Sequence, residues 1–138
     1  MPAHNKNFPW LSYYAHYNFF EEKMFEHSKV SSYKKIKNGL YEIELINRKK
    51  ITAFICECYS FGKAEFIEAN HNYGEIDAII INSSWCGYTL ELKHHCMKKK
   101  IGLFDIRGFM AAINRDEFWK YITKAELEKF EEKGWSLD

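Results

Sequence analysis

Three charged residues stand in strongly apolar surroundings near the middle of the chain. Asp77 lies in "GEIDAIII", and Glu91 and Lys93 lie in "YTLELKHH". Charged side chains are rarely buried unless they are paired or bind a metal. If the two stretches are neighbouring strands that pair antiparallel, Asp77 and Glu91 lie side by side.

This combination of side chains suits phosphodiester hydrolysis. Two adjacent carboxylates repel each other when both are ionised, and a divalent cation removes that conflict. Mg²⁺ favours one or two carboxylates together with water and phosphate oxygens. Lys93 lies two residues after Glu91, so on a strand both side chains point to one face. An ammonium there would orient or deprotonate the attacking water, or neutralise charge that develops on the phosphate.

The elements that must position these residues follow from the pattern around them. The nearly continuous Ile run of residues 75–82 predicts a strand that is buried on both faces. Residues 88–95 alternate between apolar and polar side chains, which predicts a second strand. Residues 64–70 are expected to form a short strand before them. Residues 40–61 fit both a helical stripe and a hairpin, and the lack of Gly or Asn in "RKK" favours the helix.

The remaining segments are expected to be mainly helical. The apolar stripe of residues 9–29 predicts a core-packing helix, and residues 28–39 are expected to be a polar connection. Residues 103–114 indicate a helix, although Gly108 weakens it. Residues 117–122 are a strand candidate. A capping box and the glycine at 134 delimit a final helix over 123–134.

The order of these features resembles the PD-(D/E)XK nuclease superfamily, especially its Holliday-junction-resolvase-like members. In that family an aspartate opens the second core strand and a Glu-x-Lys lies on the third, positions that "GEIDAII" and "YTLELK" match with Asp77, Glu91 and Lys93. The resemblance spans roughly residues 38–122. It implies an α/β fold with a restriction-endonuclease-like core, in which helices flank a central mixed sheet. It also implies Mg²⁺ or Mn²⁺ as cofactor and a further metal ligand from the preceding helix, for which Glu42 or Glu44 is the candidate.

Cationic residues that follow the Glu-x-Lys are candidates for nucleic-acid contacts. Lys98, Lys99 and Lys100 form a basic run in an expected loop. Such runs are usually solvated, but beside a phosphodiester site they would hold a backbone phosphate. Arg107 on the next helix is a similar candidate. His95 has the same strand parity as Lys93, so it would contact phosphate or assist proton transfer.

Composition limits the class of protein. The chain has 138 residues, of which 46% are hydrophobic and 17% aromatic, so one domain with a sizeable core is expected. We expect an aromatic-rich helical extension over residues 1–37, packed on a nuclease-like domain over 38–138. The net charge of +1 gives no bulk attraction to polyanions, so a basic surface must be local. We expect no membrane association, a cytoplasmic location and four free thiols, mostly buried.

The sequence thus predicts a metal-dependent nuclease, with DNA ahead of RNA as substrate and a homodimer or protein partner as an option. The alternative is a protein-binding module of the inhibitor or immunity type, or a nuclease fold that has lost its activity. The two differ in geometry. The enzyme requires Asp77 and Glu91 to converge beside Lys93, whereas the binding module requires exposed aromatic side chains between Trp10 and Phe20.

Overall fold

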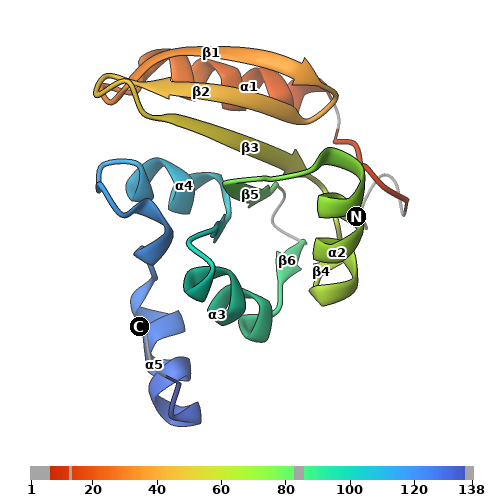
Figure 1. The fold of residues 1–138 in the computed structure, drawn as a ribbon, viewed down its shortest axis with the longest axis vertical. Coiled ribbons are helices and arrows are strands. Elements are labelled where there is room, and N and C mark those ends of the chain that lie inside the picture. The colour runs from red at the N-terminus through yellow and green to blue at the C-terminus, as the bar shows by residue number, and fades with distance from the viewer. Residues whose placement is uncertain (1–6, 13, 83–85, 136–138) are drawn as a thin grey trace.

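The computed structural model describes residues 7–12, 14–82 and 86–135, and its chain forms one mixed sheet with helices on both faces (Figure 1). The elements, in chain order, are α1 (Tyr14–Glu26), β1 (Val30–Lys37), β2 (Leu40–Leu45), β3 (Lys50–Cys56), β4 (Ser60–Phe61), α2 (Lys63–Tyr73), β5 (Ala78–Ile81), β6 (Gly87–Tyr88), α3 (Leu90–Lys98), β7 (Gly102–Phe104), α4 (Ile106–Ala112), a 3₁₀ turn η1 (Phe118–Lys120) and α5 (Lys124–Lys133).

The main sheet has the strand order β1-β2-β3-β5-β7. The first three strands form an antiparallel meander, in which Ile43 lies opposite Ile51. The last three are parallel, with Ala53 opposite Ala78 and Ala78 opposite Gly102. A second, two-stranded parallel sheet joins β4 to β6. The predicted α+β class and the mixed sheet between helices are therefore confirmed.

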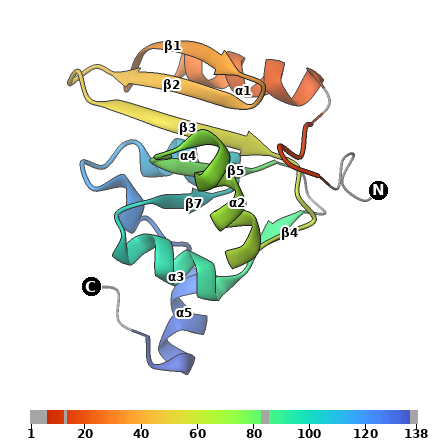
Figure 2. The same ribbon diagram turned by 45° about the vertical axis from the view of Figure 1, so that its right-hand side comes forward.

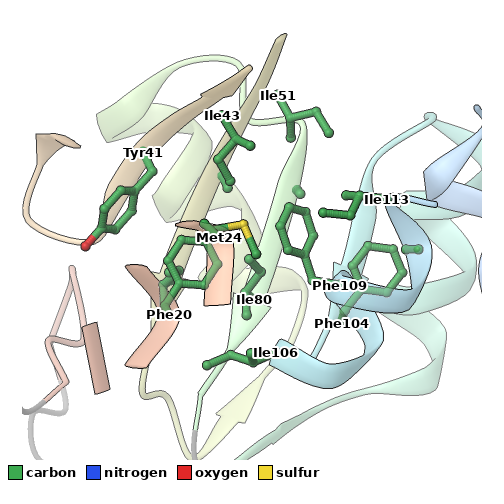
Figure 3. Close-up of a cluster of buried hydrophobic side chains, with 14 of the residues drawn as sticks. Phe20, Met24, Tyr41, Ile43, Ile51, Ile80, Phe104, Ile106, Phe109 and Ile113 are labelled. Atoms are coloured by element: carbon green, nitrogen blue, oxygen red, sulfur yellow. The ribbon is translucent and has the colours of Figure 1, made fainter. Parts of the chain in front are cut away.

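The two faces of the sheet bury separate apolar clusters. One cluster joins α1 and α4 to alternate strand residues that include Ile43, Ile51 and Ile80, as Figure 3 shows. The other packs α2, α3 and the N-terminal segment around Trp10 against the opposite face, where Phe54 and Ile79 lie. Figure 2 shows α2 and α3 together on this side. Both faces of β5 are buried, as the Ile run predicts.

The N-terminal part of the sheet differs from expectation. Residues 30–37 form the edge strand β1 rather than a connection, so the segment 1–37 is not wholly helical. Residues 40–61 contain the β2–β3 hairpin rather than a helix. The turn needs no Gly because Arg48 adopts a left-handed φ of 71° and the Asn47 side chain accepts a hydrogen bond from Lys49 N–H.

Two expected strands are helices. Residues 64–70 belong to α2, where Glu65 closes a capping interaction with the N–H of Gly62. Residues 90–98 form α3, and the Thr89 hydroxyl caps it by accepting from Leu92 N–H at 3.2 Å. In both segments apolar residues three or four apart become buried together, and this helical periodicity prevails over the period-two alternation that suggested strands.

In the C-terminal third, the final helix agrees with the sequence prediction and two other elements differ from it. The expected helix 103–114 divides into β7 and α4 at Asp105, whose side chain caps α4 by accepting from Gly108 N–H at 2.6 Å. Residues 118–120 form a 3₁₀ turn rather than a strand. The last helix is confirmed, with its Thr123–Glu126 capping box and left-handed Gly134. No helix in the described ranges is long and apolar enough to cross a bilayer.

Candidate functional site

Asp77 lies just before β5 and is bound to β3. Its backbone N–H donates to Thr52 O, and its carboxylate Oδ2 accepts from Thr52 N–H, both at 2.8 Å. The neighbours of β5 are β3 and β7, so the expected antiparallel pairing of this strand with residues 88–95 is wrong. Asp77 therefore joins β5 to β3 at the beginning of their parallel pairing. The sequence did not predict this structural role.

Glu91 and Lys93 lie on α3 and do not face Asp77. The C-terminal end of α3 leads into β7, whose first residue, Gly102, pairs with the first residue of β5. The first turn of α3, which carries the exposed Glu91, is therefore at the other end of the helix from Asp77. Lys93 is 1% exposed, and its ammonium donates to Leu103 O at 2.6 Å and lies 4.1 Å from the centre of the Phe104 ring. Burial lowers the pKa of Lys93 to about 8.

Glu42 and Glu44 were expected on a helix, but they lie on β2. Glu42 is opposite Thr52, the residue that binds Asp77, so Glu42 and Asp77 are separated by one strand. The ammonium of Lys50 is 3.9 Å from the Glu42 carboxylate. Among the described residues no three His, Cys, Asp or Glu side chains form a group able to hold a metal ion. The expected ligands thus do not fit one Mg²⁺ site.

The five residues predicted to contact nucleic acid lie in different parts of the structure. Lys99 and Lys100 line a cleft of about 780 Å³ together with Asp77. Lys98 is exposed. The His95 ring packs edge-on against Phe66, 5.9 Å between centres. Arg107 lines a different cleft, so the five residues do not form one surface for nucleic acid.

A buried carboxylate that the sequence analysis missed lies at the end of β3. Glu57 follows Cys56, is 1% exposed, and by strand parity with Ile51, Ala53 and Ile55 points to the face that α1 covers. Its Oε1 is 3.2 Å from Nδ1 of His16, a residue of α1 whose side chain is 35% exposed. A buried acid therefore lies within ion-pair distance of a histidine whose side chain is partly exposed, although the two atoms do not have hydrogen-bond geometry.

Two further buried polar side chains accompany this pair. Asn82 follows β5, and its N–H donates to Cys56 O, so Asn82 and Glu57 follow the ends of adjacent parallel strands. The Asn82 amide donates to the Ser12 hydroxyl at 3.4 Å. The Ser12 N–H in turn donates to the Tyr17 hydroxyl at 3.0 Å. Three of the four buried polar residues of the described chain, Ser12, Glu57 and Asn82, thus meet at the carboxyl ends of β3 and β5.

An open cleft of about 700 Å³ adjoins this cluster between α1 and α4. Its floor is Ile81 and Asn82, and its walls carry the cations Lys23 and Arg107. Lys23 lies seven residues after His16, which puts both on one side of α1. Asp105 also lines the cleft, at the carboxyl end of β7. Ligands of open α/β sheets bind outside the carboxyl ends of the strands, which is where this cleft lies.

The arrangement is able to bind an anion and to move a proton. Arg107 and Lys23, whose ammonium is also 3.7 Å from the Glu26 carboxylate, supply positive charge. The Asn82 side chain supplies polar atoms, and His16 and Glu57 supply a base and an acid. When such a couple is hydrogen-bonded, the carboxylate fixes the ring through Nδ1, and proton exchange with a ligand takes place at Nε2. The one sequence signal for Glu57 is its position between two cysteines at the end of the apolar run "ITAFICECY". Nothing in the sequence alone joins it to His16.

Comparison of the chain with protein-family models, with curated proteins and with solved structures finds no match in any of the three.

Proposed function

We propose that this chain hydrolyses nucleic-acid phosphodiester bonds in the α1–α4 cleft, with the His16–Glu57 pair as the proton-transfer group. The single observation that carries the proposal is the buried Glu57 carboxylate, 3.2 Å from a partly exposed histidine, at the carboxyl edge of the sheet. The activity is the one expected from the sequence, but His16 and Glu57 take the place of Asp77, Glu91 and Lys93 as the proposed site residues. A cytoplasmic location belongs to the same proposal.

The reaction would use the groups that line the cleft together with the His16–Glu57 pair, which lies beside the cleft and does not line it. Lys23 and Arg107 hold the phosphate and neutralise charge that develops on its oxygens. His16 takes a proton from the attacking water as the new bond to phosphorus forms, and Glu57 stabilises the resulting imidazolium. The bond from phosphorus to the leaving oxygen breaks, that oxygen takes a proton from solvent, and His16 returns its proton to solvent. Asn82 fixes the position of the substrate at the floor.

The Glu-x-Lys motif of the superfamily can be compared with the third strand of the sheet as it is observed, and it then matches this chain only in part. The second and third strands of the sheet are β2 and β3, whereas residues 91–93 lie on α3. β3 leads into Glu57-Cys58-Tyr59, so an acid stands at the Glu position but the exposed Tyr59 stands at the Lys position. An enzyme with this site would need a different proton-transfer group, and His16 is adjacent to the acid.

A cleavage assay tests the proposal. Labelled single- and double-stranded DNA and RNA would be incubated with wild type, His16→Ala and Glu57→Gln, with chelator, Mg²⁺ or Mn²⁺. We expect each substitution to lower cleavage by ~10²-fold or more, the usual effect of losing a positioned acid–base group. The matched controls His71→Ala and Glu68→Gln change exposed residues of α2 and should retain activity. Circular dichroism would verify that every variant is folded.

The results separate the possibilities clearly. If wild type cleaves none of the four substrates under any condition, the enzyme proposal fails. If wild type cleaves and His16→Ala cleaves equally well, the activity stands but this site is wrong. The chelator arm tests independently whether the metal expected from the resemblance is needed.

A second candidate is an inactive protein that associates through α1. Tyr14 and Phe25 are 79% and 82% exposed, and their spacing of eleven residues puts both on one face of the helix. Trp10 and Phe20, by contrast, are buried, so only part of the expected aromatic patch exists. The partner we consider is a second copy of this chain. Sedimentation of wild type and Phe25→Ser tests this, and a wild-type monomer at all concentrations would contradict it.

A further inference from the structure

An exposed aromatic ring lines the α1–α4 cleft. Phe19 of α1 is 46% exposed and belongs to the lining. The next residue, Phe20, is by contrast fully buried in the apolar core, where Figure 3 shows it beside Met24. The core therefore uses one of the two adjacent rings and leaves the other available to a ligand in the cleft.

Positive charge lies beside this ring on both walls of the cleft. The ammonium of Lys23 lies 5.3 Å from the centre of the Phe19 ring. On the other wall Arg107 is exposed, and in the described part of the chain no carboxylate lies within ion-pair distance of it. The Asp105 carboxylate also lines the cleft, but it accepts the capping hydrogen bond from Gly108 N–H. The guanidinium of Arg107 is therefore available to an anion next to the ring.

The ring also has a defined place among the groups of α1. His16, Phe19 and Lys23 are three and four residues apart, so they lie on one side of the helix. With a rise of about 1.5 Å per residue, Phe19 lies roughly 4.5 Å beyond His16 along the axis and roughly 6 Å before Lys23. The ring thus stands between the group proposed to take the proton and a cation proposed to hold the phosphate.

The two walls are tied to each other. His27, just after α1, donates from Nε2 to the carbonyl of Met110 on α4 at 2.9 Å. Its Nδ1 accepts from Lys29 N–H at 3.0 Å, which is consistent with a proton on Nε2. Met110 itself lines the cleft. The helices that carry Phe19 and Arg107 are therefore held in position before a ligand binds, which lowers the entropic cost of binding.

An exposed aromatic ring among cations is typical of sites that bind single-stranded nucleic acid. Every base has an aromatic face that can stack on such a ring, while the cations hold the phosphates of the backbone. In a duplex both faces of an internal base are covered by its neighbours, so stacking on a protein ring requires that the helix be opened. The chemistry of this cleft therefore favours an unpaired strand.

From these contacts we infer that the α1–α4 cleft takes an unpaired nucleic-acid strand, with one base stacked on Phe19 and an adjacent phosphate on Arg107 and Lys23. The inference rests on the proposed nuclease function, because it names the substrate class of the same cleft. Phe19 is then the residue that selects single strands over duplexes.

Fluorescence anisotropy with the full chain tests the inference by binding alone. DNA and RNA strands with a phosphorothioate backbone serve as probes, since they keep their charge and resist cleavage. We expect a single strand to bind about ten-fold or more tightly than a duplex of the same sequence. Phe19→Ala should lower the affinity for the single strand by about five-fold or more, the usual effect of one lost stacking contact. On a strand of abasic residues the same substitution should have an effect of less than about two-fold.

Two further variants separate stacking from general disruption of the helix. Phe19→Tyr keeps a ring and should bind like wild type. Ile67→Ala removes an apolar side chain that is 56% exposed on α2, outside the cleft, and should also bind like wild type. Arg107→Gln should weaken binding of base-containing and abasic strands alike, because its contact is with phosphate. Circular dichroism would verify that each variant is folded.

Several results would overturn the inference. These are a duplex bound as tightly as the single strand, an equal loss for Phe19→Ala on abasic and base-containing strands, Phe19→Tyr as weak as Phe19→Ala, or no binding of the single strand. A loss for Arg107→Gln that is confined to base-containing strands would contradict the placement of the phosphate. Base-dependent binding without cleavage would remove the nuclease proposal alone, and cleavage without base-dependent binding would remove this inference alone.

Discussion

The ammonium of Lys93 and the backbone carbonyl of Leu103 form a 2.6 Å hydrogen bond inside the protein. The bond ties α3 to β7, and the rings of Phe104 and Tyr88 lie 4.1 and 5.8 Å from the same nitrogen. A lysine that appeared suited to activating water is thus a packing residue. It is also the buried group whose protonation should affect stability most directly.

We predict that Lys93→Met changes the pH dependence of stability. The pKa of Lys93 is lowered by burial to about 8, below its ordinary value of 10.5. Between pH 8 and pH 10.5 the lysine is protonated in the unfolded chain and neutral in the folded chain. The free energy of unfolding of wild type therefore increases as the pH rises through this range. The advantage of the Met variant should therefore be largest below pH 8 and shrink by on the order of 3 kcal/mol towards pH 10.5.

Denaturant unfolding of both proteins at pH 7, 8, 9 and 10 measures this difference. Tyr41 and Tyr88, whose pKa values are raised by burial, oppose the trend above pH 10 but are common to both proteins and cancel. The exposed Lys98→Met is the control. A wild-type–Met difference that is the same at all four pH values would show that Lys93 is not the titrating group.

A second prediction concerns Asp77 and Glu91. Glu91 lies in the first turn of α3, whereas Asp77 precedes β5, near the other end of that helix, so the two should not share a metal ion. We therefore expect that Asp77→Asn and Glu91→Gln do not both remove one common Mn²⁺ response. Thermal unfolding with and without Mn²⁺ measures the response, since a site present only in the native state raises the midpoint. If Asp77→Asn and Glu91→Gln each abolish the Mn²⁺ shift in the unfolding midpoint, the two residues share a metal site and the positions described here are wrong.

A side chain at Gly102 should destabilise the protein. A Cβ at this first residue of β7 would collide with the Phe104 ring and lie 3.1 Å from Cε2 of Phe118. Both rings are buried, so relief would require repacking, and we expect Gly102→Ala to cost about 1–3 kcal/mol. Gly87→Ala is the matched control because nothing lies within 4 Å of its Cβ. Chemical denaturation compares the two, and equal stability would contradict the packing.

The capping box of α5 allows a local test. The Thr123 hydroxyl accepts from Glu126 N–H at 3.2 Å, and Glu126 Oε1 accepts from Thr123 N–H at 3.1 Å. Thr123→Ala removes the first bond and should lower stability by about 1 kcal/mol. Lys124→Ala, one residue later and exposed, should change it by less than about 0.5 kcal/mol. A loss confined to Lys124→Ala would refute the cap.

Local signals predicted the elements whose determinants are adjacent in sequence. The Ile run defined β5, and Thr123 with Gly134 delimited α5. The same signals failed at α3, because "YTLELKHH" fits both periods and only its packing against β7 selects the helix. They also failed at Arg48, where the hairpin turn uses a positive φ that composition does not reveal.

The candidate site was less predictable than the fold. Asp77, Lys99 and Lys100 were identified, but their meeting in one cleft depends on β7 lying beside β5. The pairing of His16 with Glu57 depends on how α1 crosses the sheet, and no spacing rule joins residues so far apart in sequence. Pattern analysis found charged residues in apolar stretches, and tertiary structure decided which of them meet.

The strand pairing also has a consequence for how the chain is synthesised. Ile43 pairs with Ile51, which is close in sequence. Ala53 pairs with Ala78, and Ala78 pairs with Gly102, so these pairs form only after a longer stretch of chain has been synthesised. Short-range pairings form faster than long-range ones, so the meander can assemble while the rest of the chain is still on the ribosome. Until β5 arrives, β3 is a bare edge with apolar residues on both faces. A nascent chain arrested after α2 should therefore aggregate through β3 unless a chaperone covers it.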